Sequence, residues 1–195
     1  MKIALVKYNA GNIVSVINAL NRLGVDPIWT NDPDEIRRAD KVIFPGVGEA
    51  RASMRSVQEN GLDALIPTLQ QPVLGICVGL QLMCKHSEEN DTDCLGIFDV
   101  RVKRFAGTSV KVPQNGWNTI SDLRSPLFDG LHEGVFVYFN NSFYAESAPN
   151  AIAITDYEGG FSAALHRDNF YAVQFHPEKS GAVGSRILEN FLRLC

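Results

Sequence analysis

The chain has 195 residues, 45% hydrophobic and 21% charged, the balance of an ordinary globular protein that can bury one full core. Its formal net charge of -4 gives no electrostatic reason to expect a nucleic acid or an anionic membrane as a partner. No segment approaches the roughly 18 to 20 apolar residues of a membrane span and residues 1–8 lack a signal-peptide pattern, so we expect one cytoplasmic domain over residues 1–195.

The first half of the chain alternates short apolar runs with amphipathic stretches. Apolar residues recur at helical spacing over residues 12–23, and Gly24 closes that stretch. Asp32 followed by Pro33 is a typical helix start. The predicted strands are 2–6, 27–29, 41–44 and 73–76, and the predicted helices are 12–23, a brief one from 33, 50–59, 62–69 and 78–86. This alternation predicts a mostly parallel sheet with helices on both faces.

The second half changes character, because short apolar runs follow one another and are joined by turns. The strands predicted there are 98–105, 135–139, 151–156, 161–166 and 170–175, and an amphipathic helix is predicted over 183–194. We therefore expect an α/β fold in which a more antiparallel layer of strands is added to the parallel core.

Cys77 stands between Gly75 and Gly79, after a predicted strand and before a predicted helix. Small neighbours at such a turn let backbone approach backbone, so that the middle side chain projects into open space. A helix start beside the sulfur also favours the thiolate. Taken alone, the motif also fits an inert cysteine packed in a tight turn. Parallel sheets bind ligands beyond the carboxyl ends of their strands, so Cys77 and the turn 46–48 are expected to share one site.

A base and a carboxylate lie two positions apart in the segment 174–178. Pro177 restricts His176 to extended conformations, which keeps Glu178 on the side of the imidazole. A thiol nucleophile needs a base and an orienting acid. We therefore interpret Cys77 as the nucleophile, His176 as base and then acid, and Glu178 as the orienting carboxylate.

A carbonyl under attack also needs hydrogen-bond donors for its developing negative oxygen. We predict the backbone amides of Val78 and of the turn that contains Val47 and Gly48 as these donors. Gln81 lies one helical turn after Cys77, where its amide could hold a polar substrate. The alternative for Gln81 is an exposed, purely structural glutamine.

The sequence predicts no metal, cofactor or disulfide. The turn 46–48 lacks the third glycine of a dinucleotide loop, because Arg51 stands there. Cys84, His86 and Cys94 match no standard zinc spacing. In a reducing cytoplasm all four cysteines, Cys195 included, are expected to be free thiols.

The Cys77 turn and the His-Pro-Glu segment resemble those of the class I, or triad, glutamine amidotransferases, and the resemblance runs through the whole chain. Three further segments make it most similar to the glutaminase subunits of imidazole glycerol phosphate synthase, in histidine biosynthesis. These segments are Lys-Tyr-Asn-Ala-Gly-Asn at 7–12, Gly-Trp-Asn at 116–118 and Glu-Lys-Ser-Gly at 178–181.

This resemblance implies a flavodoxin-like fold and hydrolysis of glutamine to glutamate and ammonia through a thioester on Cys77. It implies that ammonia passes inside a heterodimer to a cyclase subunit with a (β/α)₈ barrel, and that the turn 46–48 rests in an unproductive orientation until that partner binds with its substrate. Trp117 and Asn118, in a loop, and Tyr138 would lie near the interface. The implied glutamine pocket contains Gly48, Gln81, Asn141, Ser142 and Phe143.

Two segments depart from the family pattern. Gln114 and Asn115 stand where the family usually has His-Met, and Asn140 and Asn141 stand where it usually has Val-His before Ser142. One alternative is therefore a paralogue that feeds a different synthase, such as one for amino sugars. Two alternatives from other classes are a stand-alone thiol hydrolase with a cysteine elbow and a catalytically silent regulatory subunit.

Overall fold

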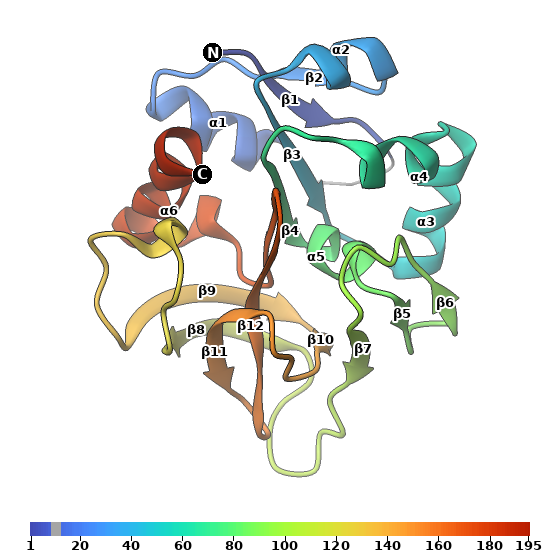
Figure 1. The fold of residues 1–195 in the computed structure, drawn as a ribbon. Helices are drawn as coiled ribbons and strands as arrows, with labels where there is room; N and C mark the ends of the chain where they lie inside the picture. Colours follow the sequence, from blue (N-terminus) through green and yellow to red (C-terminus); the bar gives the residue numbers. More distant parts are fainter. Residues whose placement is uncertain (9–12) are drawn as a thin grey trace.

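Seven strands form a central sheet in the computed structural model, which describes residues 1–8 and 13–195 (Figure 1). Their order is β11-β12-β13-β4-β3-β1-β2. Strands β2, β1, β3, β4 and β13 run parallel, whereas β12 pairs antiparallel with β13 and β11. The strands are β1 (Ile3–Val6), β2 (Ile28–Thr30), β3 (Lys41–Gly46), β4 (Val73–Cys77), β11 (Ala151–Asp156), β12 (Gly160–Arg167) and β13 (Phe170–Val173). Residues 9–12 of the family segment 7–12, and the predicted helix start at Asn12, lie outside the described residues.

Helices cover both faces of this sheet (Figure 1). Helices α1 (Val14–Arg22) and α6 (Gly181–Leu194) lie on one face. The opposite face carries α3 (Ala50–Glu59), α4 (Leu62–Leu65) and α5 (Val78–Met83). Helix α2 (Pro33–Arg38) begins as predicted, with the Asp32 side chain accepting hydrogen bonds from two first-turn amides. The expected α/β fold with a mostly parallel sheet is confirmed.

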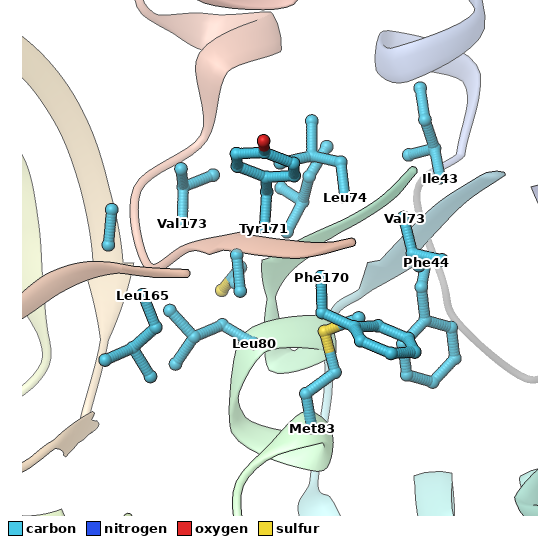
Figure 2. Packing of buried hydrophobic residues seen from close by; sticks show 14 of the residues in the cluster. Ile43, Phe44, Val73, Leu74, Leu80, Met83, Leu165, Phe170, Tyr171 and Val173 are labelled. Atoms are coloured by element: carbon cyan, nitrogen blue, oxygen red, sulfur yellow. The ribbon is translucent and has the colours of Figure 1, made fainter. Parts of the chain in front are cut away.

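The central strands are buried along their whole length, which is typical of parallel strands covered on both faces. Figure 2 shows Phe170 of β13 on the side of Met83 from α5, and Tyr171 on the opposite side. The Tyr171 ring lies 6.3 Å from the ring of Phe191 in α6. This two-sided core fixes the carboxyl ends of β3, β4 and β13, where the predicted nucleophile and base lie.

Antiparallel strands are present in the second half, as expected, and fall in three places. The predicted strand 170–175 differs, because it is β13, which pairs antiparallel with β12 but parallel with β4. Strands β11 and β12 extend the central sheet, and two small sheets have the orders β10-β7-β5-β6 and β8-β9. The strands of the two small sheets are β5 (His86–Ser87), β6 (Thr92–Asp93), β7 (Arg101–Arg104), β8 (Gln114–Ile120), β9 (Val135–Asn141) and β10 (Phe143–Ala145). Of these, only β7 and β9 were predicted, and β5 pairs parallel with β7.

Two local predictions were wrong. The helix after Cys77 does not reach residue 86, because Cys84 is extended at φ -69° and ψ 177°, and His86 lies in β5. The segment around Trp117 and Asn118 is not a loop, because it forms β8 and pairs with β9. Its polar residues and Gly116, at φ +148°, hide the alternation by which a strand is recognised.

Gly79 lets α5 pack directly on the backbone of β3. A Cβ atom at Gly79 would lie 1.9 Å from the Phe44 carbonyl oxygen. Gly79→Ala is therefore expected to lower the free energy of unfolding by about 3 kcal/mol in urea denaturation. Gly160→Ala is the matched control, because its Cβ would lie 3.8 Å from Ile154, an ordinary contact. It should change stability by less than about 1 kcal/mol, and equal losses in both variants would contradict the close approach.

Candidate active site

Cys77 occupies a strained turn between β4 and α5. Its backbone has φ 54° and ψ -109°, a conformation that residues with side chains rarely adopt. A Cβ atom at Gly75 would lie 2.6 Å from the Met83 sulfur and 3.1 Å from backbone atoms of α5, so a side chain here would displace Met83 and crowd the helix. Gly46, at the end of β3, is in register with Cys77. The two turns therefore lie side by side, as the parallel topology predicts.

His176 and Glu178 form a buried pair directly after β13, the strand next to β4. His176 Nδ1 lies 2.7 Å from Glu178 Oε1, and the two side chains are 2% and 4% exposed. Pro177 begins the short 3₁₀ turn η3 (Pro177–Lys179). The backbone amide of His176 donates to the Tyr138 carbonyl of β9 at 2.8 Å. Because Glu178 occupies Nδ1, the imidazole has Nε2 left for the sulfur.

The electrostatics favour a charged imidazole. Burial opposes protonation of His176, but the charge of Cys77 and side-chain hydrogen bonds with Cys77 and Glu178 outweigh burial and raise the pKa of His176 from 6.5 to about 10. A carboxylate behind an imidazole stabilises its protonated form. The arrangement can therefore hold a thiolate–imidazolium pair, the form in which a cysteine attacks a carbonyl.

The predicted oxyanion donors lie at the two neighbouring turns. Val78 is the first residue of α5, and Val47 and Gly48 directly follow β3. Gly48 has φ +106°, a conformation open to glycine. Just before this turn, the Pro45 carbonyl accepts a 2.6 Å hydrogen bond from the Tyr8 hydroxyl. The role of the three backbone amides stays a prediction.

Three of the five residues predicted for the glutamine pocket, Gln81, Asn141 and Phe143, meet at the Phe143 carbonyl, whereas Gly48 lies in the turn after β3. Gln81 is 3% exposed, unlike the exposed glutamine of the alternative interpretation. Its Nε2 donates to the Phe143 carbonyl at 3.0 Å, and Asn141 Nδ2 donates to the same oxygen at 2.9 Å. Ser142, which lies between Asn141 and Phe143 in the chain, contacts a different segment, because its carbonyl accepts from the Phe105 amide at 3.1 Å. The Nε2 group of Gln81 is thus held by protein atoms.

Two groups that touch the sulfur had no predicted role. Gln174 Nε2 lies 3.7 Å from Cys77 Sγ, and the Asn140 carbonyl oxygen lies 3.9 Å from it. Gln174 belongs to the segment 174–178, yet nothing in a sequence says which way a side-chain amide faces. A backbone carbonyl leaves no sequence signal at all.

Comparison with known proteins decides the family. The family model described as "Glutamine amidotransferase class-I" matches residues 5–195. The chain belongs to the class I glutamine amidotransferases. A Bacteroides fragilis protein named "Imidazole glycerol phosphate synthase subunit HisH" is 59% identical over 196 residues, and the match covers all of both chains. The Escherichia coli K12 protein of the same name is 42% identical over 196 residues, again with full coverage of both.

Solved structures support the fold of this class I amidotransferase. A crystal structure titled "glutamine amidotransferase" has a TM-score of 0.77 at 17% identity, covering 98% of this chain and 97% of that one. A glutamine amidotransferase from Thermotoga maritima has a TM-score of 0.65 at 14% identity, covering 98% of this chain and 82% of that one. At these identities the likeness concerns the fold alone.

The predicted interface residues lie on the two-stranded sheet of β8 and β9, here called the β8–β9 ribbon. Trp117 is 56% exposed, and its ring lies 6.0 Å from that of Tyr138 on the same face. Asn118 Nδ2 donates to the Asp156 carbonyl of β11 at 3.0 Å, and Asn118 lines a hollow of about 270 Å³ together with Trp117. The place of these three residues in an interface stays a prediction.

Neither a metal centre nor a membrane span is found in the described part of the chain. Within residues 1–8 and 13–195, no three His, Cys, Asp or Glu side chains gather as metal ligands would. The helices of those residues are all too short or too polar to cross a bilayer.

Proposed function

We propose that this chain is the glutaminase subunit of an imidazole glycerol phosphate synthase and serves histidine biosynthesis. The observation that carries the proposal is the buried His176–Glu178 pair at the strand end next to Cys77, in a chain 59% identical over its full length to a protein named for that subunit. Among the departures from the family pattern, Asn140 contacts Cys77, but through its backbone carbonyl, which any residue supplies. A paralogue for another synthase is less well supported, because relatives matching the whole chain are named for this subunit.

In the proposed reaction, the Cys77 thiolate attacks the side-chain carbonyl of glutamine. A carbon–sulfur bond forms, and the amide nitrogen leaves as ammonia after taking the proton of the His176 imidazolium. Neutral His176 then deprotonates a water molecule, which adds to the thioester. The carbon–sulfur bond breaks, glutamate leaves, and the thiolate–imidazolium pair returns. Val78 and the turn of Val47 and Gly48 would stabilise the oxyanion in both steps.

We further infer that the chain forms a heterodimer with a cyclase subunit built on a (β/α)₈ barrel. Ammonia released into neutral water becomes mostly ammonium, which has no lone pair for attack, so a docked acceptor is needed. A hollow of about 510 Å³ next to Trp117 supports a docking surface there. Its lining includes Phe136, which is 58% exposed. Exposed apolar patches of this kind often mark protein interfaces.

The interface assignment predicts an effect of Trp117→Ala. Loss of an aromatic anchor typically weakens an interface by about 30-fold, corresponding to about 2 kcal/mol. The dissociation constant of the purified complex, measured by calorimetry, should rise by about that factor. Ile28→Ala is the control, because Ile28 is exposed at the far edge strand β2. Equal affinities for Trp117→Ala and the unaltered chain would remove Trp117 from the interface.

Residues 1–195 are proposed to form one amidotransferase domain in the cytoplasm. Support for one domain comes from the central sheet, where β13 from the end of the chain lies between β12 and β4. Support for the location comes from the bacterial relatives, which are named for a subunit of a biosynthetic enzyme.

Reconstitution with a histidine-pathway cyclase subunit tests the proposed function. Glutamate release should rise when the cyclase and its phosphoribosyl substrate are added, and imidazole glycerol phosphate should form with glutamine as the nitrogen source. Peptidase or aldehyde hydrolase activity without glutamine turnover would favour the stand-alone hydrolase. A chain whose Cys77 is not alkylated by a glutamine-like electrophile would favour the silent subunit.

A further inference from the structure

Four side-chain and backbone amide groups form a buried chain of hydrogen bonds that ends at the catalytic sulfur. Gln174 Nε2 lies 3.7 Å from Cys77 Sγ, and Gln174 Oε1 accepts from Gln81 Nε2 at 3.1 Å. Gln81 Nε2 also donates to the Phe143 carbonyl, which accepts from Asn141 as well. Gln174 is 0% exposed, so water does not compete for these contacts.

The network fixes which end of each amide faces the sulfur. The Phe143 oxygen is an acceptor, so the end of Gln81 that faces it must be the NH₂ group. The second N–H of that group points to Gln174, whose facing atom must then be its oxygen. The Gln174 nitrogen is left for Cys77. The assignment therefore follows from a backbone carbonyl and not from the choice of an amide rotamer.

We propose that Gln174 is a further catalytic residue, whose side-chain N–H donates a hydrogen bond to the Cys77 thiolate, and that Gln81 is a positioning residue that holds the Gln174 amide in that direction. The inference rests on the proposed glutaminase function. A hydrogen bond to the charged form of a group favours that form. Gln174 therefore increases the fraction of Cys77 that is ready to attack, and it stabilises the sulfur again when the thioester breaks.

A donor is needed at this position because another neighbour opposes the thiolate. The Asn140 carbonyl oxygen, 3.9 Å from the sulfur, can accept a hydrogen bond from the neutral thiol but repels a thiolate. The titratable groups that face the sulfur are His176, backed by Glu178, and Tyr8 from the end of β1. Burial, with the charge of Cys77, raises the pKa of Tyr8, so its phenol stays neutral. Gln174 is thus an uncharged donor that does not titrate.

Alkylation of Cys77 by iodoacetamide tests this role, because it reports the thiolate and needs no glutamine. Gln174→Met keeps the side-chain length and removes the donor. At neutral pH its Cys77 should be alkylated about tenfold more slowly, with the ascending limb of the pH profile about one pH unit higher. Mass spectrometry of the Cys77 peptide separates this thiol from the other three. An unchanged profile would overturn the proposal.

A double-mutant cycle tests the positioning role of Gln81. Gln81→Met alone should slow alkylation about threefold, because the Gln174 amide can then turn away. The double variant Gln81→Met/Gln174→Met should be alkylated no more slowly than Gln174→Met, since Gln81 acts on the Cys77 thiolate only through Gln174. Effects that multiply would show that Gln81 acts independently and overturn its positioning role. If Gln174→Met does not fold, Gln81→Met still carries the test, because an unchanged profile there contradicts the network.

The control is a buried amide elsewhere. Asn190 in α6 donates to the carbonyls of Leu127 and Asp129, so Asn190→Leu removes a buried amide without touching the sulfur. Its Cys77 profile should match that of the unaltered chain, and a shift equal to that of Gln174→Met would overturn the proposal. Glutamate release is measured in parallel on each chain in complex with the cyclase subunit and its phosphoribosyl substrate. If the Gln174 shift is found but no variant or native chain turns over glutamine, the donor role stands and the glutaminase function falls.

Discussion

Cys77→Ser is expected to abolish glutamine-dependent synthesis of imidazole glycerol phosphate by the reconstituted complex, while synthesis from added ammonium salts continues. A serine hydroxyl is far less acidic than a thiol, so no nucleophilic anion forms beside His176. Loss of a triad nucleophile typically lowers the rate by about 10⁶-fold. The partner's own chemistry does not use the sulfur. Glutamate release and product formation are measured with each nitrogen source.

A second cysteine variant controls for the loss of a thiol as such. Cys94 is partly buried, and its thiol donates to the Thr92 carbonyl at 3.5 Å in the β5–β6 region. Cys94→Ser should keep both activities. If Cys77→Ser loses the ammonia-dependent reaction together with the glutamine-dependent one, the proposed division of labour between the two subunits is wrong.

His176→Asn is expected to lower glutamine-dependent activity by about 10⁴-fold, because proton transfer to ammonia and from water is lost. Glu178→Gln should lower it less, by about 10²-fold, since the imidazole keeps a hydrogen-bonding neighbour but loses a charge. Glu178 also helps to raise the pKa of His176 to about 10. Without the carboxylate, the imidazolium should lose its proton at a lower pH, so the alkaline limb of the activity profile should move down.

These two variants are best compared by single-turnover glutamate release over a range of pH. The ion pair of Lys103 in β7 with Glu146, at 2.7 Å, provides a control. Glu146→Gln should leave the alkaline limb in place. An alkaline limb that stays put in Glu178→Gln would show that Glu178 does not act on the charge of the imidazole.

The parallel half of the fold was predictable because local patterns and tertiary structure agree there. Asp32 caps α2 as its sequence suggests, and the predicted helix over 50–59 coincides with α3 (Ala50–Glu59). Strand β8 was not predictable, because its polar residues become a strand only through pairing with β9, some 20 residues later. The helix after Cys77 was predicted too long because Lys85 and His86 tolerate a helix, whereas pairing with β6 and β7 makes His86 part of a strand.

The candidate site shows the same limit. Cys77, His176 and Glu178 carry sequence signals, since each belongs to a motif of small or rigid neighbours. Gln174 lies in the same segment as His176, but nothing in the sequence indicates that Gln174 or Asn140 contacts the sulfur, because those contacts depend on how β4, β13 and β9 converge. The two ends of a side-chain amide have nearly the same shape, so the surrounding hydrogen-bond partners decide which end points inward.

Tyr138 links the predicted interface to the catalytic turn. Its ring lies beside that of Trp117. Its backbone contacts the turn that carries His176 and Glu178. The Tyr138 carbonyl accepts from the His176 amide at 2.8 Å, and the Tyr138 amide donates to Ser180 Oγ at 2.9 Å. A movement of the Tyr138 backbone is therefore passed to the backbone of His176 directly, through a hydrogen bond between main-chain atoms. The exchange rate of the His176 amide proton with deuterated solvent consequently measures the stability of the hydrogen bond between the β8–β9 ribbon and the catalytic turn.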